Sequence, residues 1–298
     1  MSYLSPMFHG AYTALVTPMR GGGVDHEALR RLVSDQIARG IDGLVPCGTT
    51  GESPALTAEE HVAIVRTVLD ETRKRVPVVP GAGSNSTRHT VELAKACKAA
   101  GADGLLLVTP YYVKPTQPGL VAHYRHVLAE AKLPAILYNV PSRTGGEILP
   151  DTVLELCAVP EVVAVKEASG NILRTQQILE RCGDRITVLS GDDALTLGIL
   201  AVGGRGVISV SSNVAPDRVA AVCRAFLGGD VARARALHYE LLPLHEVLFV
   251  ETSPGPVKAA VAMIARLGVL PEIRLPLVMP DAATLDRVAA VLGRLGIT

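Results

Sequence analysis

Short apolar runs alternate with helix-patterned segments along most of the chain. The runs are nearly continuous in apolar residues, which is typical of strands that are covered on both faces. Their starts fall about 20–35 residues apart, the spacing of repeated βα units in a parallel sheet. We expect eight strands, at Ala11–Thr17, Gly43–Cys47, Val76–Pro80, Gly104–Thr109, Ala135–Asn139, Val162–Lys166, Ile186–Ser190 and Gly206–Val210.

The segments between these runs carry signals for helix starts and stops. Asp25 precedes one helical segment, and Thr57 with Glu60 has the form of a capping box. Another helical segment reaches Ala100 and stops at Gly101. Eight βα units favour a closed (β/α)8 TIM barrel, an α/β fold, over an open doubly wound sheet.

After residue 210 the pattern changes to helices without strands between them. We expect these helices at Ala232–Val250, Pro256–Leu267 and Asp281–Leu295. The sequence therefore predicts a barrel over residues 1–229 and a C-terminal three-helix appendage over residues 230–298. This appendage would pack on the barrel or on another subunit.

Composition narrows the class of protein. The 298 residues are 48% hydrophobic, enough for a sizeable core, and Lys+Arg balance Asp+Glu at 29 each. The balanced charge gives no argument for nucleic acid or an anionic membrane, so a small metabolite is the better ligand. Five scattered cysteines without a CxxC motif indicate reduced thiols. With no secretory signal and no long apolar run, we expect a soluble, cytoplasmic protein.

The C-terminal ends of barrel strands are where active sites form, because the βα loops begin there. Polar, hydroxyl-bearing and glycine residues gather at almost all of these predicted ends, which indicates a ligand site. The stretches are Thr17–Pro18, Gly48–Glu52, Gly81–Asn85, Thr109–Tyr112, Tyr138–Gly145, Lys166–Glu167 and Ser190–Asp193.

Lys166 is the one lysine among seven that terminates a strand with a buried pattern; Lys258, for example, lies in helix-like, charged surroundings. An amine in apolar surroundings has a lowered pKa, and a neutral amine can form an imine with a carbonyl substrate. The alternative is a strand-end lysine whose ammonium group reaches water or pairs with a carboxylate.

Tyr138 is the predicted proton relay beside this amine. Strand parity places Tyr138 with Ile136, and Lys166 with Ala164 and Val162, so that all should point into the barrel. A tyrosine hydroxyl linked to another hydroxyl can pass protons. A core aromatic residue with a satisfied hydroxyl would show the same pattern.

Two further stretches suit carboxylate groups. Gly48–Glu52 supplies the hydroxyls of Thr49 and Thr50 together with closely spaced backbone N–H groups. Arg143 follows a proline that stiffens its loop, and a guanidinium group can bind a carboxylate through two hydrogen bonds. A plain turn and a solvated arginine remain the alternatives.

Three other patterns are weak. Gly81–Ser86 half resembles a dinucleotide fingerprint but lacks its third glycine. Asp192 and Asp193 have no further ligands at metal spacing, so helix capping is the better interpretation. His123 and His126 lack an HExxH pattern. We expect no nucleotide, no other cofactor and no metal.

Several motifs together resemble the dihydrodipicolinate synthase (4-hydroxy-tetrahydrodipicolinate synthase) family, within the pyruvate-dependent class I aldolase and N-acetylneuraminate lyase superfamily. The resemblance runs from about residue 8 to the end, in the same order and at compatible spacing. The motifs are GTTGES (48–53), TPYYVKP (109–115), YNVPSRTG (138–145), VKEASGN (165–171), LSGDDALTL (189–197), GVISVSSN (206–213) and PVK (256–258).

The resemblance implies a Schiff-base-forming lyase that condenses pyruvate with L-aspartate 4-semialdehyde in the diaminopimelate route to lysine. Lys166 would form the imine, and Tyr138 would relay protons through Thr49 and Tyr112. Tyr112 would cross a tight dimer interface of a homotetramer, a dimer of dimers. The remaining implied contacts are Thr50, Gly191 and Ile208 near the pyruvate carboxylate and Arg143 on the carboxylate of the aldehyde.

Lysine inhibits some members of this family, and two positions depart from the sensitive pattern. Ala58 stands where sensitive bacterial members carry His, and His89 where they carry Glu. A lost acceptor and an added basic group should weaken the binding of a cationic amino acid, so we expect weak or absent inhibition. The positions that match the lysine site are Ser53, His61, Asn85 and Tyr111.

Two rival functions stay open at this point. An N-acetylneuraminate lyase or a keto-deoxy-sugar aldolase or dehydratase would share Lys166 and Tyr138, whereas Arg143 and paired Thr49 and Thr50 favour a short aldehyde that bears a carboxylate. A catalytically silent barrel would show damage to the relay, and the relay residues are all present. Fold alone does not decide between these functions.

Overall fold

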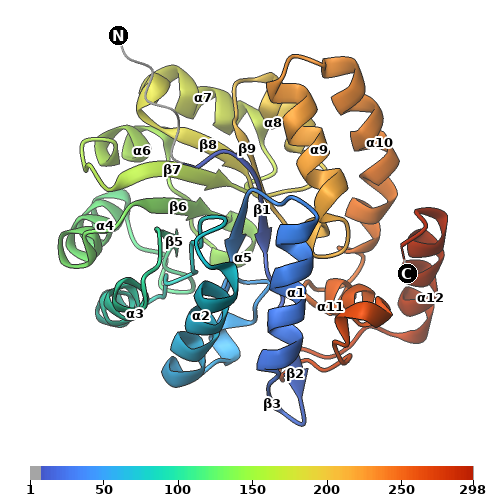
Figure 1. Cartoon of the computed structure of the whole chain (residues 1–298). Helices are drawn as coiled ribbons and strands as arrows, with labels where there is room; N and C mark the ends of the chain where they lie inside the picture. Colours follow the sequence, from blue (N-terminus) through green and yellow to red (C-terminus); the bar gives the residue numbers. More distant parts are fainter. Residues whose placement is uncertain (1–7, 298) are drawn as a thin grey trace.

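The computed structural model describes residues 8–297. Its main sheet is parallel, wound into a barrel and surrounded by helices (Figure 1), with the strand order β4-β1-β9-β8-β7-β6-β5. The strands are β1 Gly10–Ala14, β4 Gly43–Val45, β5 Leu105–Val108, β6 Ala135–Asn139, β7 Val162–Glu167, β8 Thr187–Ser190 and β9 Gly206–Ser209.

The predicted third strand lies between the two edge strands of this sheet as segment 77–82. Leu44 of β4 donates its N–H to Pro77 O at 3.0 Å, and Leu106 of β5 donates to Pro80 O at 2.9 Å. The two prolines have no N–H to donate, so only one isolated parallel bridge forms on each side. This segment links β4 to β5, and the prediction of a (β/α)8 barrel is confirmed.

Helices cover the outside of the sheet, and the predicted caps are present. Asp25 Oδ1 accepts the N–H of Ala28 at 2.9 Å, and Thr57 and Glu60 form the reciprocal capping box. Outside the barrel helices, a short hairpin of β2 (Met19–Arg20) and β3 (Gly23–Val24) was not predicted. The helices that follow the strands are α1 His26–Ala38, α2 Ala58–Thr72, α3 Thr87–Ala100, α4 Gln117–Ala131, α5 Pro141–Thr144, α6 Pro150–Leu156, α7 Ile172–Cys182, α8 Thr196–Ala201 and α9 Pro216–Leu227, with 3-10 turns η1 Ser53–Ala55, η2 Gly183–Arg185 and η3 Ser211–Asn213.

Three further helices follow the barrel, as predicted. They are α10 Val231–Val247, α11 Gly255–Ala262 and α12 Ala282–Arg294, with a 3-10 turn η4 at Ala265–Leu267. Figure 1 shows them together on one side of the barrel, and α10 packs along α9. The division at residues 229 and 230 stays a prediction. Among residues 8–297, no helix is both long enough and apolar enough to span a membrane.

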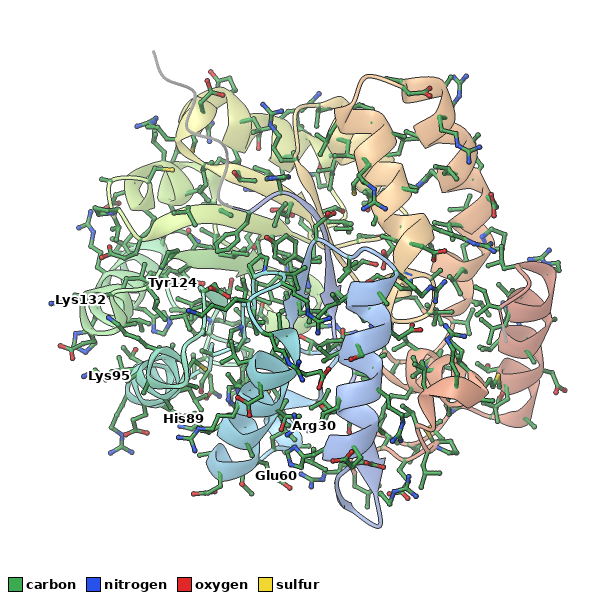
Figure 2. The ribbon with its side chains drawn as sticks, viewed as in Figure 1. Arg30, Glu60, His89, Lys95, Tyr124 and Lys132 are labelled. Carbon is green, nitrogen blue, oxygen red and sulfur yellow. The ribbon has the colours of Figure 1, made fainter. Side chains whose placement is uncertain are left out.

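Two apolar layers hold this architecture together. One lies between the sheet and the helices, and the other fills the barrel with residues that include Tyr138, Ala164 and Ile208. The parity argument holds for Ala164 but is wrong for Val162, because a register shift between β6 and β7 turns Val162 into the outer layer. On the outer side of the helix layer, charged side chains such as Lys95 and Lys132 are exposed to solvent (Figure 2).

Candidate active site

Lys166 and Tyr138 are directly paired across neighbouring strands. Lys166 is at the end of β7 and opposes Tyr138 at the end of β6. The Lys166 Nζ atom lies over the tyrosine ring, 4.2 Å from its centroid. The Lys166 side chain is almost completely buried, at 5% exposure. The barrel therefore holds an amine and a phenol side by side at the ends of its strands.

Burial changes the acid–base properties of both groups. Desolvation lowers the pKa of Lys166 to about 7; the charge of Asp193 opposes this shift and that of Arg143 adds to it. A large fraction of the amine is consequently neutral near neutral pH. Burial raises the pKa of Tyr138, although Arg143 and a side-chain hydrogen bond with Thr49 oppose this. Tyr138 is thus a protonated phenol linked to a second hydroxyl.

The loop after β4 holds Thr49 and Thr50 in a compact turn. The N–H of Gly51 donates to Gly48 O, and that of Glu52 donates to Thr49 O, both at 3.1 Å. Thr17 fastens the loop to the end of β1, since its Oγ1 donates to Gly51 O at 2.7 Å. These hydrogen bonds fix the conformation of the loop that is predicted to bind a carboxylate.

A buried ion pair ties this loop to the C-terminal helices. Lys258 Nζ of α11 lies 2.5 Å from Glu52 Oε1, and neither side chain is exposed by more than 1%. The other oxygen, Glu52 Oε2, accepts the backbone N–H of Arg274 at 3.0 Å. Lys258 lies in a helix and among charged groups, as its sequence context indicated. Within residues 8–297 its salt-bridge partner is a carboxylate 206 residues away, which the sequence context did not indicate.

Arg143 is located on the single-turn helix α5, which begins directly after β6 at Pro141. Its Nη2 donates a long hydrogen bond to Ser253 O, at 3.5 Å. No carboxylate within the described residues forms an ion pair with Arg143. The guanidinium group therefore remains available for an anionic ligand.

Gly191 and Asp193 follow β8 on the other side of Lys166. A Cβ atom at Gly191 would come within 3.0 Å of Lys166 Cε and 2.6 Å of Ala168 Cβ, so only glycine leaves the lysine side chain its space. Asp193 is buried and accepts hydrogen bonds from Ser209 Oγ and from the N–H groups of Val210 and Ser211. The prediction that Asp192 and Asp193 cap a helix is wrong, because the N-cap of α8 is Leu195.

The side chains around Lys166 line a cavity of about 360 Å³. It contains six of the predicted site residues, namely Thr49, Thr50, Tyr138, Arg143, Lys166 and Gly191. Ile208 does not line it but is buried within the barrel, and Tyr112 is 87% exposed on the surface. A neighbouring cavity of about 210 Å³ shares Thr49, Tyr138 and Arg143 and extends to Tyr111.

The C-terminal helices supply one wall of the main cavity, which sequence reasoning missed. His245 and Glu246 of α10 line it, and so do Phe249 and Ser253 in the segment that follows. Their sequence signal is weak, since they stand at least 79 residues after Lys166, and only the packing of α10 along α9 brings them to the barrel mouth.

The fold and the buried amine define the class of protein, a (β/α)8 barrel with a buried lysine at the end of its sixth strand. A model of the dihydrodipicolinate synthetase family matches residues 7–294, so the chain belongs to this family. A 4-hydroxy-tetrahydrodipicolinate synthase of Nitratidesulfovibrio vulgaris is 52% identical over 97% of this chain and 99% of its own length.

Solved structures agree with this assignment. Dihydrodipicolinate synthase from Aquifex aeolicus superposes with a TM-score of 0.95 at 44% identity, over 97% of this chain and 99% of that one. A structure described as the first monomeric dihydrodipicolinate synthase variant has a TM-score of 0.95 at 40% identity and covers 98% of both chains.

Proposed function

We propose that this protein is a 4-hydroxy-tetrahydrodipicolinate synthase that condenses pyruvate with L-aspartate 4-semialdehyde. The observation that carries the proposal is the Lys166 amine, whose pKa is about 7, in one cavity with Tyr138, Thr49 and Arg143. The names of the relatives, at about half identity over nearly the whole chain, support the same reaction.

The first half of the reaction forms the nucleophile. The neutral Lys166 amine attacks C2 of pyruvate, and loss of water gives a protonated imine. Thr49 and Thr50 hold the pyruvate carboxylate, with backbone contacts from Gly191 and Ile208. The imine withdraws electrons from C3, so that C3 loses a proton and an enamine forms. Tyr138 carries protons during these steps through its hydrogen bond with Thr49.

The second half joins the aldehyde to this enamine. Arg143 binds the carboxylate of the semialdehyde and places its carbonyl carbon near the enamine C3. A C–C bond forms, and the amino group of the aldehyde partner then displaces Lys166 from the imine carbon to close the ring. The free amine is regenerated, so the chain requires no cofactor for this sequence of steps.

We further propose a homotetramer, a dimer of dimers, in the cytoplasm, with Tyr112 reaching the relay of the adjacent subunit. In a single chain Tyr112 is exposed and lies outside the cavity, which supports a role across an interface. All five cysteines are free thiols, in keeping with a reducing compartment.

A substrate comparison tests the proposed function. The protein would be given pyruvate with aspartate 4-semialdehyde or with sugar aldehydes, and product formation would be followed for each pair. Of these aldehydes, we expect only aspartate 4-semialdehyde to react with pyruvate to give product. Turnover only with sugar aldehydes would assign the chain to the sugar-acid lyases of the superfamily, and failure to form an imine with pyruvate would indicate a silent barrel.

A further inference from the structure

Ring closure in the proposed reaction requires a base, and the steps above assign this role to no residue. This inference rests on the proposed function. The α-amino group of the aldehyde partner enters as an ammonium ion at neutral pH, and an ammonium nitrogen has no lone pair with which to attack. One proton must therefore leave this nitrogen inside the cavity before it can displace Lys166.

His245 is a buried imidazole in the wall of that same cavity. It is 5% exposed and lines the cavity together with Lys166, Gly191 and Asp192. Its Nδ1 lies 2.8 Å from Ser211 Oγ, and Ser211 is fully buried after the end of β9. With Nδ1 engaged, Nε2 is the ring nitrogen left for a ligand.

The charges around His245 suit a group that is neutral at rest and briefly cationic. Burial lowers the pKa of His245 below its ordinary value, so the ring is neutral near pH 7. Three carboxylates oppose this shift, Asp192 and Asp193 from the loop after β8 and Glu246 from α10. They would stabilise an imidazolium during a proton transfer. His238 is a further titratable neighbour, with its ring centroid 5.7 Å away, and the cationic side chains that line the same cavity are Lys166 and Arg143.

We propose that His245 is a further catalytic residue, whose Nε2 removes the proton from the ammonium group of the aldehyde partner. Ser211 Oγ accepts the Nδ1–H and thereby keeps Nε2 unprotonated. The freed amine uses its lone pair to form a C–N bond to the imine carbon and passes its excess proton to Lys166 Nζ. The bond from this carbon to Nζ then breaks with its electron pair going to Nζ, and His245 returns its own proton to solvent.

The test is His245→Gln in the full-length protein, with His238→Gln as the matched control. His238 is a buried histidine of the same helix that does not line this cavity. At pH 7 we expect His245→Gln to lower kcat on the order of 100-fold. The deficit should shrink toward pH 9, where the amine loses its proton unaided. Borohydride should then trap the open-chain adduct of both substrates on Lys166, while His238→Gln should retain most of its activity.

The outcomes separate this inference from the proposed function. Wild-type kcat in His245→Gln would overturn the role of His245, and so would an equal loss of pyruvate imine formation or a deficit that is the same at pH 7 and pH 9. Ser211→Ala serves as a second variant and should show a smaller deficit with the same pH dependence. If the wild-type protein forms the pyruvate imine but gives no product with aspartate 4-semialdehyde, the proposed function fails, and the base assigned here has no reaction to serve.

Discussion

Lys166 is almost completely buried, and this burial affects its pKa more than any single neighbouring charge does. Burial disfavours the ammonium form and lowers the pKa to about 7, while Asp193 limits the shift. The neutral amine is the reactive form, so imine formation should rise with pH through pH 7 and reach a plateau above it. The rate of borohydride trapping with pyruvate, measured from pH 5 to pH 9, checks this. A rate that still rises steeply at pH 9 would show an ordinary lysine pKa.

Arg143 should act mainly on the second substrate, because its contribution to the lowered pKa of Lys166 is smaller than that of burial. Its guanidinium group has no carboxylate partner in the described part of the chain, and it lines the cavity beside Ser142. We expect Arg143→Ala to raise the KM for the aldehyde and lower kcat/KM by at least about tenfold, with little change in pyruvate trapping. Arg125→Ala, which removes a surface arginine paired with Glu155, is the control. Equal losses in both half-reactions would contradict the assignment.

The sequence identified residues whose role depends on their own strand end, and it missed those whose role depends on distant packing. Lys166 and Tyr138 could be predicted because adjacent strands carry them at the same level. Local sequence alone suggested that Asp193 caps a helix. Its actual hydrogen-bond partners could not be predicted, because they lie 16 to 18 residues further along the chain. His245 reaches the cavity only through the packing of α10, which no local pattern encodes.

At the scale of elements, α11 is linked to the Gly48–Glu52 loop by the buried ion pair of Lys258 and Glu52. Removing one partner leaves an unpaired charge in the core, so Lys258→Met should destabilise the protein by about 3–5 kcal/mol. The double variant with Glu52→Gln should recover part of that loss, because it also removes the orphaned charge. Urea unfolding of both variants provides the measurement. Equal stability of Lys258→Met and the wild type would show that the pair is solvated.

The loops after β4 and segment 77–82 line a third cavity, in which lysine inhibition can be tested. This cavity of about 140 Å³ includes Ser53, His61 and Tyr111 and both departing positions, Ala58 and His89. Figure 2 shows His89 on the outside of the barrel wall. We expect less than twofold inhibition at about 1 mM lysine. Ala58→His with His89→Glu should increase it, and strong inhibition of the wild type would refute the prediction.

For the whole molecule, the repeated βα pattern was sufficient to predict the barrel, because each buried strand contributes an apolar run of its own. The exceptions have local causes. Segment 77–82 loses its regular ladder to two prolines, and the β2–β3 hairpin is too short to leave a pattern. The proposed assembly is a different case, since a single chain shows only that Tyr112 is exposed.

Subunit complementation tests whether Tyr112 acts across an interface. Tyr112→Phe and Lys166→Met chains should each be strongly impaired. In a mixed dimer, one site has an intact Lys166 and receives an intact Tyr112 from its neighbour. Refolding the two chains together should therefore recover roughly a quarter of wild-type activity. No recovery despite dimer formation would mean that Tyr112 serves its own chain or none.

The most direct test of the whole account is to locate the covalent adduct. The protein would be incubated with pyruvate, reduced with borohydride, digested and sequenced by mass spectrometry. We predict one reduced pyruvate per chain, on Lys166, with Lys258 and the other lysines unmodified and no adduct in Lys166→Met. An adduct on another lysine, or none at all, would contradict the claim that the barrel works through this amine.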